Sequence, residues 1–549
     1  MKRFIPTSVA LILLSVSLSA CSPAETSKSL DQYLTQEVSW TECSEDLFVE
    51  VDQQSSLFKS LTPDCSTVLV PANYETSSAE NKEFGIALMR ISKATESKFK
   101  GTLFINPGGP GGSGIEQLQW SNFPDDLVKH FDIVGFDPRG VGASQFTDGT
   151  EIKCSDELDY RTYFEGEASP SNFEEYQASI PLSDEYYSDC VERNPLWWTL
   201  STSNVVDDLD VMREVLTGDE PLNFIGTSYG TTIAGLYVSK YPENVGKIVL
   251  DSPTTVDEDP IKSAVENYKA METKLNSYLD YYAEQEGKTS AEAWQDLLYV
   301  KQMADDDELI GYAGLVRSDT EPSLMVSSES LLTRGILALN YFPEQDAKEE
   351  FAKAIKEAID YRSNWAFEFY ALRMDGYDPD SLKGSSLSAK KLKRTNSFEI
   401  MTIVNSMDYS PEELSIEDQK KMAKQMKAVA PKLYALNLDS SGYQYYGESL
   451  GVDWVSIANE DDSIPDPPTT PLIRENKSSK KLLIVGSIYE AVTPYQFSKD
   501  TAKLLKSPLI SVESSTHGPA AGYDIPCLND VLIDFFVNDI VPGDMTCKA

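Results

Sequence analysis

A serine lies between two glycines in Gly226-Thr227-Ser228-Tyr229-Gly230, directly after the apolar run 222–225 and before a helix-forming stretch. A G-x-S-x-G pattern in this context predicts a sharp strand-to-helix turn that lifts the serine hydroxyl clear of a sheet. The amino end of the following helix favours developing negative charge. The pattern therefore predicts that Ser228 is a nucleophile.

A serine nucleophile needs a general base, and the sequence contains two histidines, His130 and His517. His130 precedes a predicted strand at 131–136, whereas His517 follows a predicted strand at 509–512. Parallel α/β sheets place ligands at the carboxyl ends of their strands. We therefore expect His517 to be the base and His130 to be a surface or packing residue at the opposite end.

The third member of a triad is a carboxylate that fixes the imidazole tautomer and stabilises the imidazolium. The loop 486–494 follows the predicted strand 481–485, and Glu490 is its only acid. Asp251 is the rival candidate, because it directly follows the predicted strand 247–250. The position favours Glu490, and Asp251 stays as the alternative.

A glycine-rich segment, Asn106-Pro107-Gly108-Gly109-Pro110-Gly111-Gly112-Ser113-Gly114, follows the predicted strand 102–105. Its five glycines let the main chain approach a substrate closely. It lacks the Lys-Ser/Thr of a P-loop, so phosphate binding is not expected. We assign the N–H groups of Gly109 and Tyr229 to an oxyanion hole. The motif Asp137-Pro138-Arg139-Gly140 is expected to brace the neighbouring loops.

Short β-rich runs alternate with helical stretches, which predicts the α/β class with a mostly parallel sheet covered on both faces. Eight strands are expected, as in an α/β-hydrolase, at 66–70, 85–91, 102–105, 131–136, 222–225, 247–250, 481–485 and 509–512. The alternation of strands and helices stops after Pro253. The next segment reads as helices with acidic faces, which predicts a lid at 254–470. The core then comprises 38–253, with an insertion at 145–200, and 471–549.

The chain has 549 residues and a formal net charge of −41. Such a charge repels phosphate, so binding to nucleic acid is not expected. The one basic cluster, Lys390, Lys391, Lys393 and Arg394, is interpreted as a solvated loop.

The first twenty residues have the pattern of an export signal, with Lys2 and Arg3 before an apolar run at 9–18. The run ends in Leu18-Ser19-Ala20-Cys21, which resembles the lipobox of bacterial lipoproteins. The resemblance implies a signal peptide at 1–20, a lipidated Cys21, a tether at 21–37 and attachment to a lipid bilayer. The expected location is the bacterial cell envelope, outside the cytoplasm.

The six remaining cysteines are an even number in a chain expected to leave the cytoplasm, which predicts three disulfides. They form three couples that are local in sequence, and we expect these couples to pair: Cys43 with Cys65, Cys154 with Cys190, and Cys527 with Cys547.

The glycine-rich segment, Asp137-Pro138-Arg139-Gly140, the Ser228 pentapeptide and the His517 block together resemble the tripeptidyl aminopeptidase and prolyl aminopeptidase family of α/β-hydrolases. The resemblance covers nearly the whole mature chain and is weakest across the lid and the 145–200 insertion. It implies an exopeptidase that removes short peptides or single residues from free N-termini, without metal or cofactor.

Two positions depart from that family's pattern. Glu490 stands where the family usually has Asp, and Ser406 stands where a lid segment usually has Cys before its aspartate, here Asp408. The resemblance nominates Asp408 as a partner for the α-ammonium of a peptide. An esterase on the same scaffold is the alternative function, because a triad alone does not distinguish an amide from an ester. A non-catalytic binding protein is a third class, which the retained Ser228 and His517 disfavour.

Overall fold

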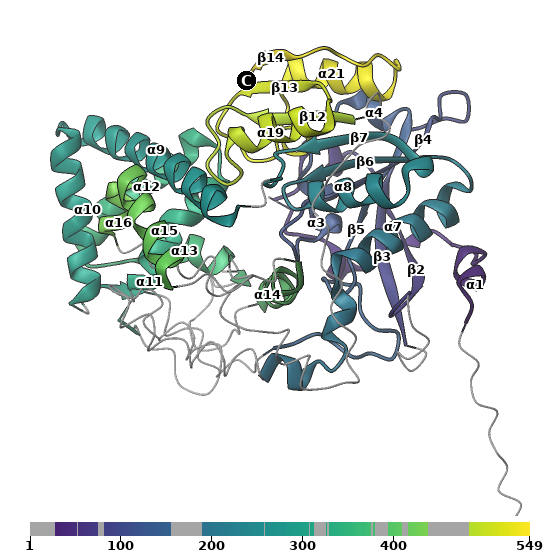
Figure 1. Cartoon of the computed structure of the whole chain (residues 1–549), viewed down its shortest axis with the longest axis horizontal. Helices are drawn as coiled ribbons and strands as arrows, with labels where there is room; N and C mark the ends of the chain where they lie inside the picture. The colour runs from purple at the N-terminus through teal and green to yellow at the C-terminus, as the bar shows by residue number, and fades with distance from the viewer. Residues whose placement is uncertain are drawn as a thin grey trace, which may run out of the picture.

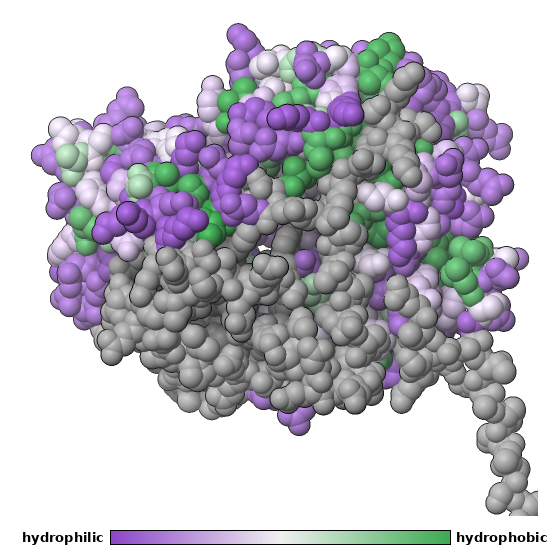
Figure 2. Space-filling model, in the orientation of Figure 1, coloured by the Kyte–Doolittle hydropathy of each residue, from purple (hydrophilic) through white to green (hydrophobic). Residues whose placement is uncertain are grey.

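The computed structural model describes residues 28–51, 53–74, 82–154, 189–256, 259–306, 308–311, 325–326, 329–374, 377–378, 393–408, 416–436 and 482–549. Cys21, the predicted signal peptide and the basic cluster up to Lys391 lie outside these residues. No described helix combines the length and the apolarity needed to cross a bilayer. On the face in Figure 2, hydrophilic residues cover much of the described surface, in keeping with the high acidic content.

In the described part of the chain, ten strands form one sheet in the order β1-β2-β3-β5-β4-β6-β7-β12-β13-β14. Along this order the neighbouring pairs from β5 to β14 are parallel, and the pairs β1–β2, β2–β3 and β3–β5 are antiparallel. The strands are β1 (Thr41–Glu42), β2 (Asp64–Pro71), β3 (Glu83–Ile91), β4 (Gly101–Asn106), β5 (Phe131–Phe136), β6 (Leu222–Thr227), β7 (Val245–Asp251), β12 (Leu482–Ser487), β13 (Leu509–Glu513) and β14 (Met545–Lys548). The chain therefore has the α/β-hydrolase architecture that the sequence predicts.

The predicted count of eight strands is too low by the two edge strands, β1 and β14. β1 has only two residues, and both are exposed. β14 buries only Cys547 of its four residues. Edge strands so short and polar lack the apolar run by which a buried strand is recognised.

Helices cover both faces of the sheet, because successive residues of its central strands point to opposite faces. Phe104 of β4 joins one hydrophobic cluster, and its neighbours Leu103 and Ile105 join the other. The first face carries α7 (Thr202–Thr217), α8 (Gly230–Lys240) and α19 (Tyr495–Leu505). The second carries α3 (Gly114–Trp120), α4 (Asp125–Val128), α20 (Pro519–Gly522) and α21 (Pro526–Phe536).

A second group of helices gathers to one side of the sheet (Figure 1). It has its own hydrophobic cluster, which includes Tyr278, Leu297 and Phe351. Its elements are α9 (Pro260–Glu286), α10 (Ser290–Asp305), α11 (Glu329–Ala338), η5 (Leu339–Tyr341), α12 (Glu344–Tyr361), α13 (Trp365–Met374), α15 (Ile416–Val429) and α16 (Pro431–Ala435). These helices occupy the predicted lid segment, and we call them the lid bundle. The exact domain boundaries stay a prediction.

Helix α14 (Ser397–Asp408) lies between the lid bundle and the sheet (Figure 1). Its apolar residues, among them Phe398, Ile403 and Met407, pack into the cluster on the first face of the sheet. Although α14 belongs to the lid segment in sequence, it is therefore anchored on the core.

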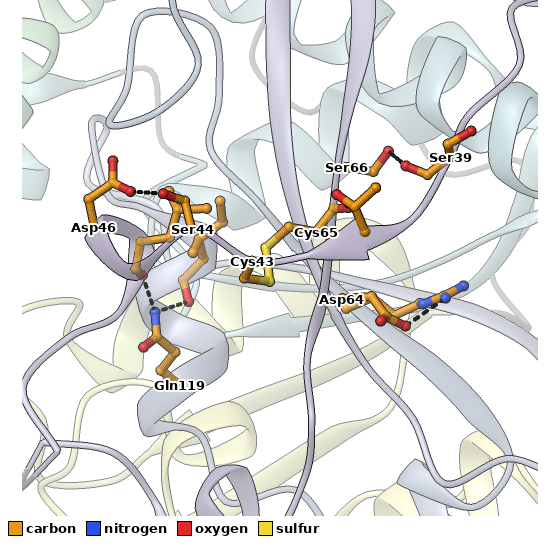
Figure 3. The surroundings of a disulfide bond; sticks show 12 residues. Ser39, Cys43, Ser44, Asp46, Asp64, Cys65, Ser66 and Gln119 are labelled. Atoms are coloured by element: carbon orange, nitrogen blue, oxygen red, sulfur yellow. Dashed lines mark hydrogen bonds and ion pairs between the residues drawn. A yellow bond between two sulfur atoms is a disulfide. The ribbon is translucent and has the colours of Figure 1, made fainter.

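The six described cysteines form the three disulfides that the sequence predicts, Cys43–Cys65, Cys154–Cys190 and Cys527–Cys547. Figure 3 shows the Cys43–Cys65 disulfide beside two hydrogen bonds that hold the amino-terminal segment. Ser66 Oγ donates to Ser39 O at 3.0 Å, and Gln119 Nε2 donates to Leu47 O at 2.8 Å. A disulfide that closes a loop of this length stabilises a fold by about 3 kcal/mol.

Candidate active site

Ser228 lies in the turn between β6 and α8 and has a left-handed backbone conformation, with φ of 57°. This conformation is unfavourable for a residue with a Cβ and is typical of a nucleophile at such a turn. The flanking glycines are required, since a Cβ on Gly226 would lie 2.2 Å from Gly230 O. The N–H of Ser228 donates to Asp251 O at 2.9 Å, which ties the turn to the end of β7.

The glycine-rich segment crosses directly over the start of α8. A Cβ on Gly108 would lie 2.6 Å from Tyr229 N and 2.8 Å from Gly230 N, so only glycine permits this approach. Gly109 has φ of 112°, a conformation that glycine adopts freely. The structure thus brings together the backbone segments of Gly109 and Tyr229, the two predicted oxyanion donors.

His517 and Glu490 follow the neighbouring parallel strands β13 and β12, and His517 Nδ1 is hydrogen-bonded to Glu490 Oε1. The Glu490 carboxylate also accepts bonds from Thr493 Oγ1 at 2.7 Å, Thr493 N at 3.2 Å and Ser252 Oγ at 2.8 Å. Its side chain is fully buried, so these donors offset the loss of water around the charge.

Asp251, the rival acid, is buried beside the pair but does not bond the imidazole in the part of the chain that the structure describes. Its Oδ2 accepts from Ala520 N at 2.9 Å and from Thr227 Oγ1 at 3.4 Å. Burial, reinforced by the charge of Glu490, raises the pKa of the Asp251 carboxyl to about 7. The geometry favours Glu490 as the partner of His517.

The histidine loop packs against the Ser228 turn. A Cβ on Gly518 would lie 2.5 Å from Thr227 Cγ2, so the residue after His517 rests on the residue before Ser228. Between described residues no hydrogen bond joins Ser228 Oγ to His517. Proton transfer needs a separation of about 2.6–3.2 Å, and such contacts commonly tighten when substrate binds. His130 lies at the opposite end, with Nδ1 2.7 Å from Asp126 O.

The Asp137 motif braces the loops around the site, as predicted. Asp137 accepts from Ser113 Oγ at 2.5 Å and from Ala143 N at 3.0 Å. Arg139 is buried, and its Nε donates to Asp208 Oδ2 at 2.7 Å. The Arg139 guanidinium also donates to the backbone oxygens of Ala72 and Thr199, at 2.7 and 2.8 Å, so both side chains hold backbone segments in place.

Helix α14 brings Asp408 to the site. The Asp408 carboxylate accepts hydrogen bonds from the hydroxyls of Tyr229 and Thr202, the latter at 2.6 Å. The other end of α14 lies on the glycine-rich segment, where a Cβ on Gly111 would lie 2.3 Å from Ser397 O. Asp408 is half-buried and adjoins the residue that follows Ser228. The side chain of Ser406 lies outside the described atoms.

Comparison with known proteins agrees with this geometry. The α/β-hydrolase fold family matches residues 101–309, which include the glycine-rich segment and Ser228. A family described as TAP-like protein matches residues 450–547, which include Glu490 and His517. The chain has the α/β-hydrolase fold, and its carboxyl-terminal part is similar to the TAP-like family.

Several curated proteins are similar to this chain. Tripeptidyl aminopeptidase of Streptomyces lividans is 32% identical over 267 residues, which are 46% of this chain and 48% of that protein. The alignment thus spans about half the length of that relative. Serine protease Hip1 of Mycobacterium tuberculosis is 24% identical over 87% of this chain and 86% of its own length. Carboxylesterase B of the same species is 25% identical over 88% of this chain and 85% of its own.

Two lid residues near the histidine were not predicted. Lys274 of α9 is 4% exposed, and its Nζ donates to Ser515 O at 3.2 Å. Burial lowers the pKa of this ammonium to about 8. Tyr341 packs edge-on against the His517 ring, with centroids 5.7 Å apart. Lys274 stands three residues after Met271 and four before Tyr278, so it lies on the side of α9 that faces inward. A lysine at helical spacing from these apolar residues was the feature of the sequence that could have indicated a buried ammonium.

No group of three or more His, Cys, Asp or Glu side chains within the described residues is arranged to hold a metal ion.

Proposed function

We propose that this α/β-hydrolase is a serine exopeptidase that releases short peptides or single residues from free N-termini. The turn at Ser228, the bond between His517 and Glu490, and the likeness to a tripeptidyl aminopeptidase and a serine protease support the proposal. No metal or cofactor takes part in the proposed reaction.

In the proposed mechanism, neutral His517 accepts the proton of Ser228 Oγ as this oxygen attacks the scissile carbonyl carbon. The N–H groups of Gly109 and Tyr229 stabilise the resulting oxyanion. The imidazolium, held by Glu490, then protonates the leaving amine, and the C–N bond breaks to leave an acyl-enzyme ester on Ser228. Water activated by His517 hydrolyses this ester and restores the serine.

One observation carries the exopeptidase assignment: a lid carboxylate, Asp408, is hydrogen-bonded to Tyr229, directly after the nucleophile. An exopeptidase must distinguish a free α-ammonium from the interior of a chain. A partly buried carboxylate at a fixed distance from Ser228 offers that distinction, because a charge-assisted hydrogen bond contributes about 1.5–3 kcal/mol. We propose that Asp408 accepts this bond from the substrate.

The test is to incubate the purified protein with a mixture of peptides and to identify the released fragments by mass spectrometry. Fragments taken consistently from free N-termini, and absent with Ser228→Ala, support the proposal. Cleavage at internal bonds, or fragments that persist with Ser228→Ala, would contradict it.

An esterase is the second candidate, favoured by the likeness to carboxylesterase B. The same triad would then form its acyl-enzyme from a carboxylic ester. Rapid hydrolysis of simple acyl esters by a preparation that releases nothing from peptides would support the esterase and contradict the peptidase.

We also propose that the chain acts in a bacterial cell envelope, outside the cytoplasm, held to the lipid bilayer through an acylated Cys21. The lipobox-like sequence supports the anchor, and the three disulfides support an oxidising compartment. Cys21→Ala should move the protein from the membrane fraction to the soluble fraction. An unchanged distribution would contradict the lipid anchor.

A further inference from the structure

Ser252 follows the end of β7 and combines complete burial with a left-handed backbone. Its side chain is 0% exposed, and its φ is 54°. Glycine adopts this conformation freely, whereas serine does so at a cost. Strained residues of this kind persist when the surrounding structure uses them, and they gather at functional sites.

The hydroxyl of Ser252 joins the two segments that carry the acid and the base. Ser252 Oγ donates to Glu490 Oε2 at 2.8 Å and accepts from Gly518 N at 3.0 Å. The N–H of Gly518 occupies a lone pair of this oxygen, so the hydroxyl proton is directed at the carboxylate. The contact therefore has a fixed direction, from serine to glutamate.

The backbone of Ser252 is tied to the same region. Its N–H donates to Val485 O at 2.9 Å, and its carbonyl accepts from Thr493 Oγ1 at 3.0 Å. The single hydroxyl proton of Thr493 is shared between this carbonyl and Glu490 Oε1, which lies 2.7 Å from the same Oγ1. Ser252 thus contacts β12, the glutamate loop and the histidine loop at once.

We propose that Ser252 is a positioning residue that holds the Glu490 carboxylate against His517. A glutamate has one more rotatable bond than an aspartate, so its carboxylate needs a second anchor to keep Oε1 facing the imidazole. Ser252 supplies that anchor at Oε2, and the left-handed backbone is what places the hydroxyl there. The inference rests on the proposed serine-hydrolase function.

The decisive variant is Ser252→Gly, because it removes the hydroxyl and relieves the backbone. If Ser252 positions the carboxylate, Ser252→Gly lowers kcat at least tenfold with KM unchanged, and its Tm stays above that of Ser252→Ala because the backbone strain is relieved. Ser252→Ala keeps the unfavourable φ, so it should show the same loss in kcat together with a lower Tm. Ser487→Ala is the matched control. Ser487 is fully buried at the end of β12, and its hydroxyl has no hydrogen-bond partner in the part of the chain that the structure describes.

A fluorophosphonate probe, which reacts with activated serines, separates this inference from the proposed function. Labelling of wild type at Ser228, detected by intact and peptide mass, supports a serine hydrolase whatever its substrate. The inference then predicts labelling at least tenfold slower for Ser252→Gly and wild-type labelling for Ser487→Ala. Absence of labelling at Ser228 in wild type would overturn both the function and the inference.

A double-mutant cycle with Glu490→Gln completes the test. Ser252→Gly should change the labelling rate less than twofold in the Glu490→Gln background, because its effect passes through that carboxylate. Wild-type labelling by Ser252→Gly alone, or an undiminished effect in the Glu490→Gln background, would overturn the inference and leave the proposed function intact.

Discussion

The sheet and the lid contribute to the site in different ways. Ser228, Glu490 and His517 each follow a parallel strand, β6, β12 or β13. The N–H of Tyr489 joins the glutamate loop to Ser514 O of the histidine loop, and the N–H of Ser228 joins its turn to the end of β7. Asp408 and Lys274 lie on the lid-segment helices α14 and α9. Asp408 accepts hydrogen bonds from the hydroxyls of Tyr229 and Thr202, and Lys274 donates to Ser515 O. We therefore propose that the core side holds the geometry of the triad and that the lid side contacts the substrate.

This difference between core and lid suggests that the core determines the catalytic rate and the lid determines which substrates are preferred. Most buried apolar residues of the lid bundle form a hydrophobic cluster of their own, while Leu372 of α13 packs into the cluster on the first face of the sheet. Substitutions on the core side should lower kcat for every substrate. Substitutions on the lid side should change which substrates are preferred.

The largest effect is expected at the strand ends. Ser228→Ala or His517→Ala should lower kcat by about 10⁶-fold, leaving the residual catalysis of binding and the oxyanion hole. His130→Ala, at the opposite end of the sheet, is the matched control and should keep wild-type turnover. Steady-state kinetics on one peptide test both statements, and an active His517→Ala variant would refute the core assignment.

The next effect separates the two carboxylates. Glu490→Gln should lower kcat by about 10⁴-fold, because the imidazole loses the group that fixes its tautomer. Asp251→Asn should stay within about tenfold of wild type, since an amide oxygen can still accept from Ala520 N. The reverse order of these two kcat values would transfer the acid to the end of β7.

A smaller effect is expected at Lys274, where the lid bundle contacts the core, and it concerns the free energy of unfolding. Burial lowers the pKa of Lys274 to about 8, below its value in an unfolded chain. Between about pH 8 and 10.5 the unfolded state binds more protons, so the free energy of unfolding of wild type should rise with pH in that window. The rise relative to Lys274→Met should be on the order of 1–3 kcal/mol.

Denaturant unfolding at pH 7 and pH 10 measures this change, with Lys353→Met, an exposed substitution on α12, as the control. Parallel pH profiles for wild type and Lys274→Met would contradict the account of Lys274.

The core side could be predicted from sequence because each of its features is marked by a short stretch of neighbouring residues. All eight predicted strands are present, and Glu490 and His517 meet because they follow neighbouring parallel strands. The three disulfides follow from cysteine spacing. Of the strands in the ten-stranded sheet, β1 and β14 were not predicted, since their few residues carry no buried apolar run.

The remaining features depend on how distant segments pack. Nothing local to Ser252 shows that its hydroxyl will meet Glu490, 238 residues later. Lys274 could have been noticed on the inward stripe of α9, but the sequence does not show that this stripe reaches Ser515. Asp408 was nominated by family resemblance alone, and its contact with Tyr229 is a product of the docking of α14.

The central proposal is that the core catalyses the reaction and that the lid segment recognises the free N-terminus of the substrate. Its most direct test uses one peptide with a free or an acetylated N-terminus. Wild type should show a kcat/KM at least about tenfold higher for the free peptide, the equivalent of one charge-assisted hydrogen bond. Asp408→Asn should lose most of this preference, and Asp360→Asn, an exposed change on α12, should keep it. Equal cleavage of the free and acetylated peptides by wild type would contradict the account.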